Sequence, residues 1–179
     1  DRGSGIKNSD KGVITTDNDT VIKSNSGYGI YNTAPNLVVN KGTIIGIYNE
    51  GTMTIDNNII VHKPTGNLYG IHNKGTFTMN NGEVSVTGEE YLINNENKFD
   101  FNGGSITSDR VALRNTGEFN ANGGIITSNI TSISNGGTLN VKGSEISSST
   151  NTTILNTASG SVTNVYDGQV VAHDGIGIG

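Results

Sequence analysis

The sequence contains no cysteine and no tryptophan, and only 2 of its 179 residues are proline. Without cysteine the chain forms no disulfide bond, no iron–sulfur cluster and no cysteine-ligated zinc site, and it has no thiol nucleophile. In the absence of covalent cross-links, its stability must come from repeated hydrogen bonds and from the stacking of side chains.

Charge is also scarce: 15% of residues are charged, and the formal net charge is −5. Because phosphate binding needs a basic stripe, this balance argues against nucleic acid as a partner, and it disfavours anionic membrane surfaces. No apolar run approaches the roughly 18 to 20 residues of a membrane-spanning helix. Residues 1–10 lack the apolar segment of a signal peptide, so we expect a mature or excised piece with no membrane insertion.

Glycine, asparagine and β-branched residues are plentiful instead, with 26 glycines in the chain. The hydrophobic fraction of 32% is low for a single thick core. Disordered chains usually combine high charge with few β-branched residues, and this chain has neither property. The composition therefore favours many short strands, joined by tight turns, around a thin core.

An internal repeat defines the architecture. "GIYNEGTMTIDNN" at residues 46–58 returns as "GIHNKGTFTMNNG" at residues 70–82. An asparagine two residues after an apolar position recurs with spacings of 17, 24, 22, 20, 20 and 21 residues, at Asn32, Asn49, Asn73, Asn95, Asn115, Asn135 and Asn156. A period near 21 residues fits one turn of a three-stranded parallel β-helix. We therefore predict an all-β, right-handed parallel β-helix of about seven coils, with residues 1–26 as a degenerate N-terminal coil and 27–179 as the repeats.

Alternation within each repeat predicts which side chains face the core. The first strand supplies the column Ile30, Ile47, Ile71, Ile93, Leu113, Ile133 and Ile154. Two residues earlier, a second inward column is expected at Tyr28, Ile45, Tyr69, Tyr91, Val111, Thr131 and Thr152. The second strand supplies Leu37/Val39, Met53/Ile55, Phe77/Met79, Phe99/Phe101, Phe119/Ala121 and Leu139/Val141, and the third supplies Ile59/Val61, Val84/Val86, Ile106, Ile126, Ile146 and Val170.

The repeated asparagines have a structural explanation. Asparagine tolerates the left-handed conformation of a sharp corner, and its amide both donates and accepts, so stacked asparagines form a hydrogen-bonded ladder. Glycine supplies positive φ at the corner after the second strand, as at Asn81-Gly82. The third corner carries the insertions, at residues 62–69, 87–91 and 148–153. Insertions on one face of a solenoid often mark a binding face, although drift of a surface loop explains them as well.

Repeats such as "NTGEFNANGGIITS" and "SNGGTLNVKGSEIS" are similar to those of bacterial adhesin-like β-helix surface proteins. That group includes the passenger domains of self-associating autotransporters and the repeat regions of wall-anchored surface proteins. The resemblance extends from about Gly27 to Gly168 and is one of style, without a motif that carries catalytic or ligand roles. It implies an extracellular location on the bacterial surface and a role in adhesion. The implied partners are a host-cell glycan or protein, or the same protein on a neighbouring cell.

One outward column is the candidate ligand-binding stripe. The residue between the inward apolar position and the ladder asparagine must face solvent, and this column begins Tyr31, Tyr48, His72, Asn94 and Arg114. Rings beside amide and guanidinium donors suit sugar rings and their hydroxyls. Packing between neighbouring strands, which stabilises the sheet, explains the same residues. Glu50 and Lys74 are expected to be neighbours on adjacent coils and to form a surface ion pair.

Carboxylates are scattered along the chain, and the three histidines never fall at ligand spacing. We therefore expect no catalytic residue, no metal site and no cofactor. The sequence predicts a non-catalytic surface adhesin with weak self-association through its polar sides. Two alternatives stay open: a stalk that displays another domain, and a β-helix enzyme that cleaves polysaccharide.

Overall fold

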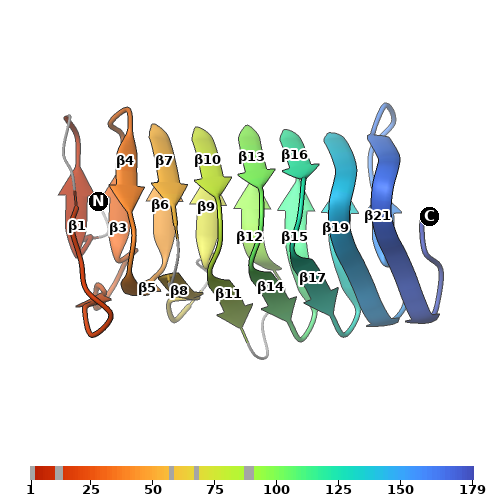
Figure 1. Ribbon diagram of the computed structural model, residues 1–179, viewed down its shortest axis with the longest axis horizontal. Helices are drawn as coiled ribbons and strands as arrows, with labels where there is room; N and C mark the ends of the chain where they lie inside the picture. The colour runs from red at the N-terminus through yellow and green to blue at the C-terminus, as the bar shows by residue number, and fades with distance from the viewer. Residues whose placement is uncertain (1–2, 11–13, 57–58, 67–68, 87–90) are drawn as a thin grey trace.

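The computed structural model describes residues 3–10, 14–56, 59–66, 69–86 and 91–179. Within these ranges the chain forms 21 strands and no helix, and every strand pair is parallel. Figure 1 shows the turns stacked along the long axis, from the N-terminal turn in red to the C-terminal turn in blue. The predicted all-β parallel solenoid is confirmed, with about 8 turns of about 21 residues. Its first turn is the N-terminal segment expected to be a degenerate coil.

The first strand of each turn belongs to an 8-stranded sheet in the order β1–β3–β6–β9–β12–β15–β18–β20. Its strands are β1 (Ile6–Asn8), β3 (Ile30–Asn32), β6 (Ile47–Asn49), β9 (Ile71–Asn73), β12 (Tyr91–Asn95), β15 (Val111–Asn115), β18 (Thr131–Asn135) and β20 (Ile154–Asn156). Each repeat therefore returns its "apolar-x-Asn" segment to the same sheet, one turn further along the axis.

The second and third strands form a 13-stranded sheet that bends around the core. The second strands are β4 (Leu37–Val39), β7 (Thr52–Ile55), β10 (Thr76–Met79), β13 (Lys98–Phe101) and β16 (Glu118–Ala121). The third strands are β2 (Val21–Ile22), β5 (Gly42–Ile45), β8 (Ile59–His62), β11 (Glu83–Val86), β14 (Ser105–Ser108) and β17 (Ile125–Ser128). In the last two turns they merge into β19 (Thr138–Thr150) and β21 (Val162–Asp174), with register shifts near Lys142. The predicted three strands per turn are thus partly fused at this end.

The core is a thin column in which like side chains stack on like. The predicted first-strand column, from Ile30 to Ile154, is fully buried at every position. In the second strands the rings of Phe77 and Phe99 lie 4.8 Å apart, and those of Phe99 and Phe119 lie 5.2 Å apart. This repeated burial is how a lean composition fills a solenoid interior.

The predicted second inward column is only partly correct. Its members Tyr28, Thr131 and Thr152 are buried, whereas the prediction is wrong for Ile45, Tyr69, Tyr91 and Val111, which are half-buried. Tyr28 and Tyr69 contact the outward rings of Tyr48 and His72. The chain places two consecutive residues inside at the third corner, which interrupts the two-residue alternation: Leu92 and Ile93 are both fully buried. The position of Leu92 is held in the other turns by Gly5, Gly29, Gly46, Gly70, Ala112, Ser132 and Thr153. Ile22 and Ile44 belong to the third-strand core column but were not predicted there.

Buried hydroxyls replace apolar groups at this corner toward the C-terminus. The hydroxyls of Ser128 and Ser132 lie 3.0 Å apart, and those of Ser148 and Thr153 lie 2.7 Å apart. The Thr153 hydroxyl also donates to the carbonyl of Val171 at 2.9 Å. Because each hydroxyl has a partner, the polar part of the core avoids the cost of an unsatisfied buried group.

The asparagine ladder runs through the other end of the same first strands. From Asn8 to Asn156, each side-chain amide donates to the side-chain oxygen of the asparagine one turn further on, at 2.8 to 3.1 Å. Asn8 joins the ladder although it was not among the predicted residues. The expected left-handed backbone is wrong for these asparagines, because the described non-glycine residues with positive φ are Asn36 and Asn151. The ladder residues lie in strands, and hydrogen bonding alone explains them.

Candidate functional site

The predicted outward column lies on the outer face of the 8-stranded sheet, one residue per turn. Tyr31 is in register with Tyr48, Tyr48 with His72, His72 with Asn94, and Asn94 with Arg114. Each follows a buried apolar residue and precedes a ladder asparagine, so the strand alternation turns it outward. The fold therefore brings all five predicted residues into one row.

The aromatic residues of this row pack against one another. The rings of Tyr31 and Tyr48 are stacked, with centroids 4.9 Å apart and planes 4° from parallel. His72 meets Tyr48 edge-on at 4.8 Å, and Tyr69 meets His72 edge-on at 5.1 Å. Tyr28 completes this ring cluster with a centroid 5.4 Å from that of Tyr48. The faces that Tyr31 and Tyr48 turn toward each other are therefore covered, and a sugar would meet ring edges there.

The row is less exposed than the sequence suggested. Tyr31, Tyr48 and Arg114 are half-buried, the His72 side chain is 14% exposed, and Asn94 is 2% exposed. The reason lies at the third corner, where Tyr28 packs against the Tyr48 ring and Tyr69 packs against the His72 ring. Sequence alternation could not show this, because it assigned both tyrosines to the interior.

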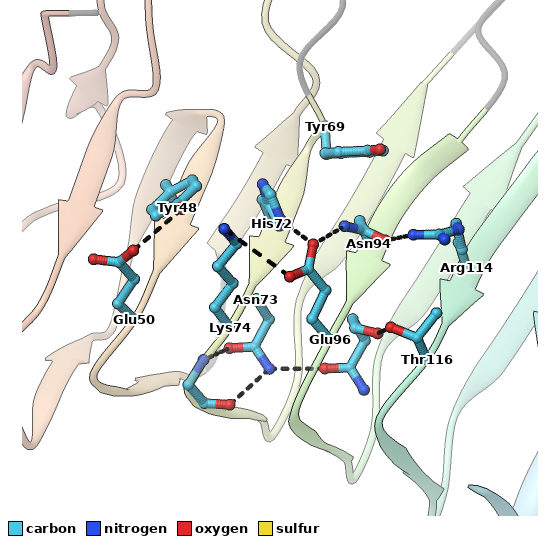
Figure 2. A network of polar contacts seen from close by, with 12 residues as sticks. Tyr48, Glu50, Tyr69, His72, Asn73, Lys74, Asn94, Glu96, Arg114 and Thr116 are labelled. Carbon is cyan, nitrogen blue, oxygen red and sulfur yellow. Dashed lines mark hydrogen bonds and ion pairs between the residues drawn. The ribbon is translucent and has the colours of Figure 1, made fainter. Parts of the chain in front are cut away.

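Glu96 is the centre of a polar network on this face (Figure 2). One carboxylate oxygen lies 2.7 Å from His72 Nε2 and accepts from the Asn94 amide at 2.8 Å, while the other lies 4.0 Å from Lys74 Nζ. Arg114 donates to the Asn94 oxygen at 3.0 Å. Partial burial raises the pKa of the Glu96 carboxyl, but His72, Lys74 and Asn94 together hold that pKa below its usual value. Sequence reasoning predicted His72, Asn94 and Arg114 but missed Glu96, which follows the ladder asparagine as Glu50 does.

Glu50 forms a hydrogen bond with each of the two stacked tyrosines. It accepts from the Tyr31 hydroxyl at 2.9 Å and from the Tyr48 hydroxyl at 3.2 Å. The hydrogen bond to Glu50 raises the pKa of the Tyr31 phenol. Lys74, the expected ion-pair neighbour of Glu50, lies 5.6 Å from the centre of the Tyr48 ring and pairs with Glu96. Tyr48, and after it Glu96, raise the pKa of the Lys74 ammonium group.

These contacts determine what the row can do chemically. Glu50, Lys74 and Glu96 lie beside the row, contact its side chains and are exposed, so they present hydrogen-bonding groups to solvent next to ring edges. Within the described ranges, no group of three or more histidine, aspartate and glutamate side chains is placed to hold a metal ion. The geometry suits recognition by hydrogen bonds and ring edges.

Two further rows of amides lie on the second strands and their corners. On the outer face, Asn120 donates to Asp100 at 2.8 Å, Asn140 donates to Asn120 at 2.9 Å, and Asn164 donates to Asn140 at 2.8 Å. At the second corner, Asn122 donates to Asn102 and Asn102 to Asn80, both at 2.9 Å. The same spacing that revealed the buried ladder could have revealed these rows.

No family model matches the chain, and neither a curated protein nor a solved structure matches it. The strand topology by itself defines the class of the chain, a parallel β-solenoid repeat protein. Within the described ranges, no helix is long and apolar enough to span a membrane.

Proposed function

We propose that this chain is the repeat region of an extracellular bacterial surface adhesin. It attaches the cell to a host-cell glycan or protein, or to the same protein on a neighbouring cell, and it performs no catalysis. The observation that carries the proposal is the ordered row of outward side chains on the 8-stranded sheet, in register from Tyr31 to Arg114. The resemblance of the repeats to adhesin-like β-helix proteins supports the location and the role.

The physical basis of attachment is repetition. Neighbouring strands lie about 4.8 Å apart, so each row presents one side chain per turn at a fixed interval. A single hydrogen bond to a partner contributes about 1 kcal/mol net, and several in register add up along the solenoid. Because ladders and ring contacts already hold many of these side chains, little conformational entropy is lost on binding.

A non-adhesive stalk is the second candidate, and a specific observation favours it. In the outward row the hydroxyls of Tyr31 and Tyr48 and the side chains of His72, Asn94 and Arg114 all have partners within the chain. Contacts of this kind between neighbouring strands stabilise a sheet whether or not a ligand binds. A stalk would need only this stiffness.

The test is display of the chain on the surface of a non-adherent bacterium. Adherence to host-cell monolayers and mutual aggregation are measured, with cells that carry the empty display anchor as the control. The adhesin proposal predicts gains in at least one assay, and their loss in a triple variant of Tyr31→Ala, Tyr48→Ala and His72→Ala that retains its circular dichroism spectrum. No gain over the empty anchor would support the stalk. Adherence that persists in the folded triple variant would place the binding surface elsewhere.

A further inference from the structure

The outer face of β8, β11 and β14 is hollowed at both ends of the strands. A hollow of about 620 Å³ lies at the second corner, where Ile60, Asn81, Glu83 and Ser105 are among the lining residues. A hollow of about 470 Å³ lies at the third corner, where the lining includes His62, Pro64, Ser85, Thr107 and Asp109. The two hollows lie at opposite ends of the same three strands.

The strand register joins the hollows through two rows of outward side chains. Ile60, Glu83 and Ser105 are in register at the second-corner end, and His62, Ser85 and Thr107 are in register at the third-corner end. The residues between the rows, such as Val84 and Ile106, are fully buried. Both rows therefore face outward, and together they line one continuous surface from corner to corner.

The two corners bound this surface. At the second corner Gly82 has φ +120°, and a side chain there would lie 2.6 Å from the carbonyl oxygen of Ile59. At the third corner the segment after β8 includes Pro64, which is buried and lies close to Gly46. That segment belongs to the insertion at residues 62–69, of which 67–68 lie outside the described residues, as do residues 87–90 of the next insertion.

The chemistry of the lining indicates one class of ligand. Ser85, Ser105 and Thr107 supply hydroxyls and His62 supplies an imidazole, groups that both donate and accept like the hydroxyls of a sugar. Ile60 is 38% exposed and offers an apolar patch for the C–H face of a sugar ring. Glu83 and Asp109 add carboxylates, one at each end, which accept from sugar hydroxyls and repel acidic groups. The lysine of the lining, Lys63, donates to the carbonyl of Gly66 at 2.7 Å.

We propose that the outer face of β8, β11 and β14 binds a short neutral oligosaccharide that extends along the strands from one hollow to the other. This inference rests on the proposed function for its choice of a cell-surface ligand, and it names the ligand class and the face. It places a second recognition surface on the third strands, distinct from the ring cluster on the 8-stranded sheet.

The test uses an array of neutral, uronic-acid-containing and sialylated glycans, probed with the full purified chain. We expect binding to neutral glycans in preference to acidic ones. Ser85→Trp fills the third-corner hollow and weakens that binding by about tenfold or more through steric exclusion. Thr127→Trp, in the same outward row but two strands away on β17, is the matched control and binds within about twofold of the wild type.

Three results would overturn the inference: no bound glycan, a preference for acidic glycans, or undiminished binding by a folded Ser85→Trp variant. Loss of binding in the Tyr31→Ala, Tyr48→Ala and His72→Ala variant with retention in Ser85→Trp would likewise move the site to the ring cluster. The adhesin proposal fails separately. If cells that display the chain adhere although the chain binds no glycan, only the oligosaccharide site on β8, β11 and β14 is contradicted. If the chain binds glycan through this face but the cells do not adhere, only the adhesin proposal is contradicted.

Discussion

The amide of Asn73 lies in the middle of the buried ladder and has five hydrogen-bond partners. Its nitrogen lies 2.8 Å from the Asn95 oxygen, 2.8 Å from the Lys98 carbonyl and 3.0 Å from the Gly75 carbonyl, so its two hydrogens are shared among three acceptors. Its oxygen accepts from Asn49 at 2.8 Å and from the Gly75 amide at 3.2 Å. Because buried partners lose their bonds together, we expect Asn73→Ala to lower the free energy of unfolding by about 3 kcal/mol, measured by urea denaturation.

Asn97→Ala is the matched control for that substitution. Asn97 is exposed, and its side chain makes one bond of 3.3 Å to the Lys74 carbonyl. Its removal should change the free energy of unfolding by less than about 0.5 kcal/mol. Equal losses in the two variants would show that the ladder contributes nothing beyond an ordinary surface amide.

Glu96 makes stability depend on pH. Burial raises the pKa of its carboxyl, but its contacts with His72, Lys74 and Asn94 leave that pKa below the ordinary value of 4.5. A carboxyl with a lowered pKa in the folded state stabilises the fold above its unfolded pKa, and this contribution is lost as pH falls through the folded value. At pH 7 we expect the Glu96→Gln substitution to lower the free energy of unfolding by about 0.5 kcal/mol relative to the wild type.

Urea denaturation at a series of pH values tests the Glu96 prediction. The difference between wild type and Glu96→Gln should narrow as pH falls below 4.5, the ordinary carboxyl value. Glu145→Gln removes an exposed carboxylate on β19 and serves as the control for net charge. A constant difference between wild type and Glu96→Gln from pH 7 to pH 3 would contradict the assigned role.

At the scale of the element, strands and corners obey different rules. Gly66 and Gly82 both have positive φ, at +85° and +120°. A side chain on Gly66 would meet nothing within 4 Å, whereas a side chain on Gly82 would lie 2.6 Å from the Ile59 carbonyl oxygen. We expect Gly66→Ala to lower the free energy of unfolding by about 1 kcal/mol through backbone strain alone. Gly82→Ala should cost about 3 kcal/mol, since the clash adds to the strain.

Thermal and urea unfolding of the two glycine variants, measured side by side, give this comparison. Because both positions share the left-handed backbone, the difference between them isolates the close approach of the neighbouring turn at the second corner. Similar costs at Gly66 and Gly82 would mean that the turns can separate there without penalty.

The same contrast explains what could be predicted from the sequence. Strand interiors follow a two-residue alternation, so columns such as Ile30 to Ile154 and the ring stack of Phe77, Phe99 and Phe119 were predicted correctly. Corners interrupt that alternation. Leu92 and Ile93 are consecutive and both buried, which breaks the alternation at this corner. A strict two-residue alternation therefore predicted that Tyr69 faces the core, whereas Tyr69 belongs to the outer ring cluster. The partial burial of the candidate site follows from that corner geometry.

A missed signal was also present in the N-terminal turn. "IKN" at residues 6–8 has the apolar-x-Asn form of every other first strand, and Asn8 lies 24 residues before Asn32, as Asn49 lies before Asn73. The pairings of Glu96 had no such signal. Its contacts join two turns, and periodicity identifies neighbours without showing which of several charged side chains will meet.

Over the whole molecule, each turn contacts mainly the turns beside it, so stability is close to a sum of turn and interface contributions. The centre of the solenoid then decides whether the two ends unfold together. Phe99 lies near that centre, is fully buried, and touches Phe77 and Phe119 on the adjacent turns at 4.8 and 5.2 Å. Truncation to alanine should remove about 4 kcal/mol through lost contacts and the cavity left behind.

Because this loss falls between two stacks of turns, Phe99→Ala should uncouple them. Hydrogen exchange followed by mass spectrometry should then resolve two groups of amides, before and after β13, with different opening free energies. Leu37→Ala is the control, since Leu37 is equally buried but lies in β4, near the N-terminal end. It should accelerate exchange only in the turns at that end. Uniform acceleration along the whole chain in both variants would mean that the solenoid unfolds as one cooperative unit, and the additive description of its turns would be wrong.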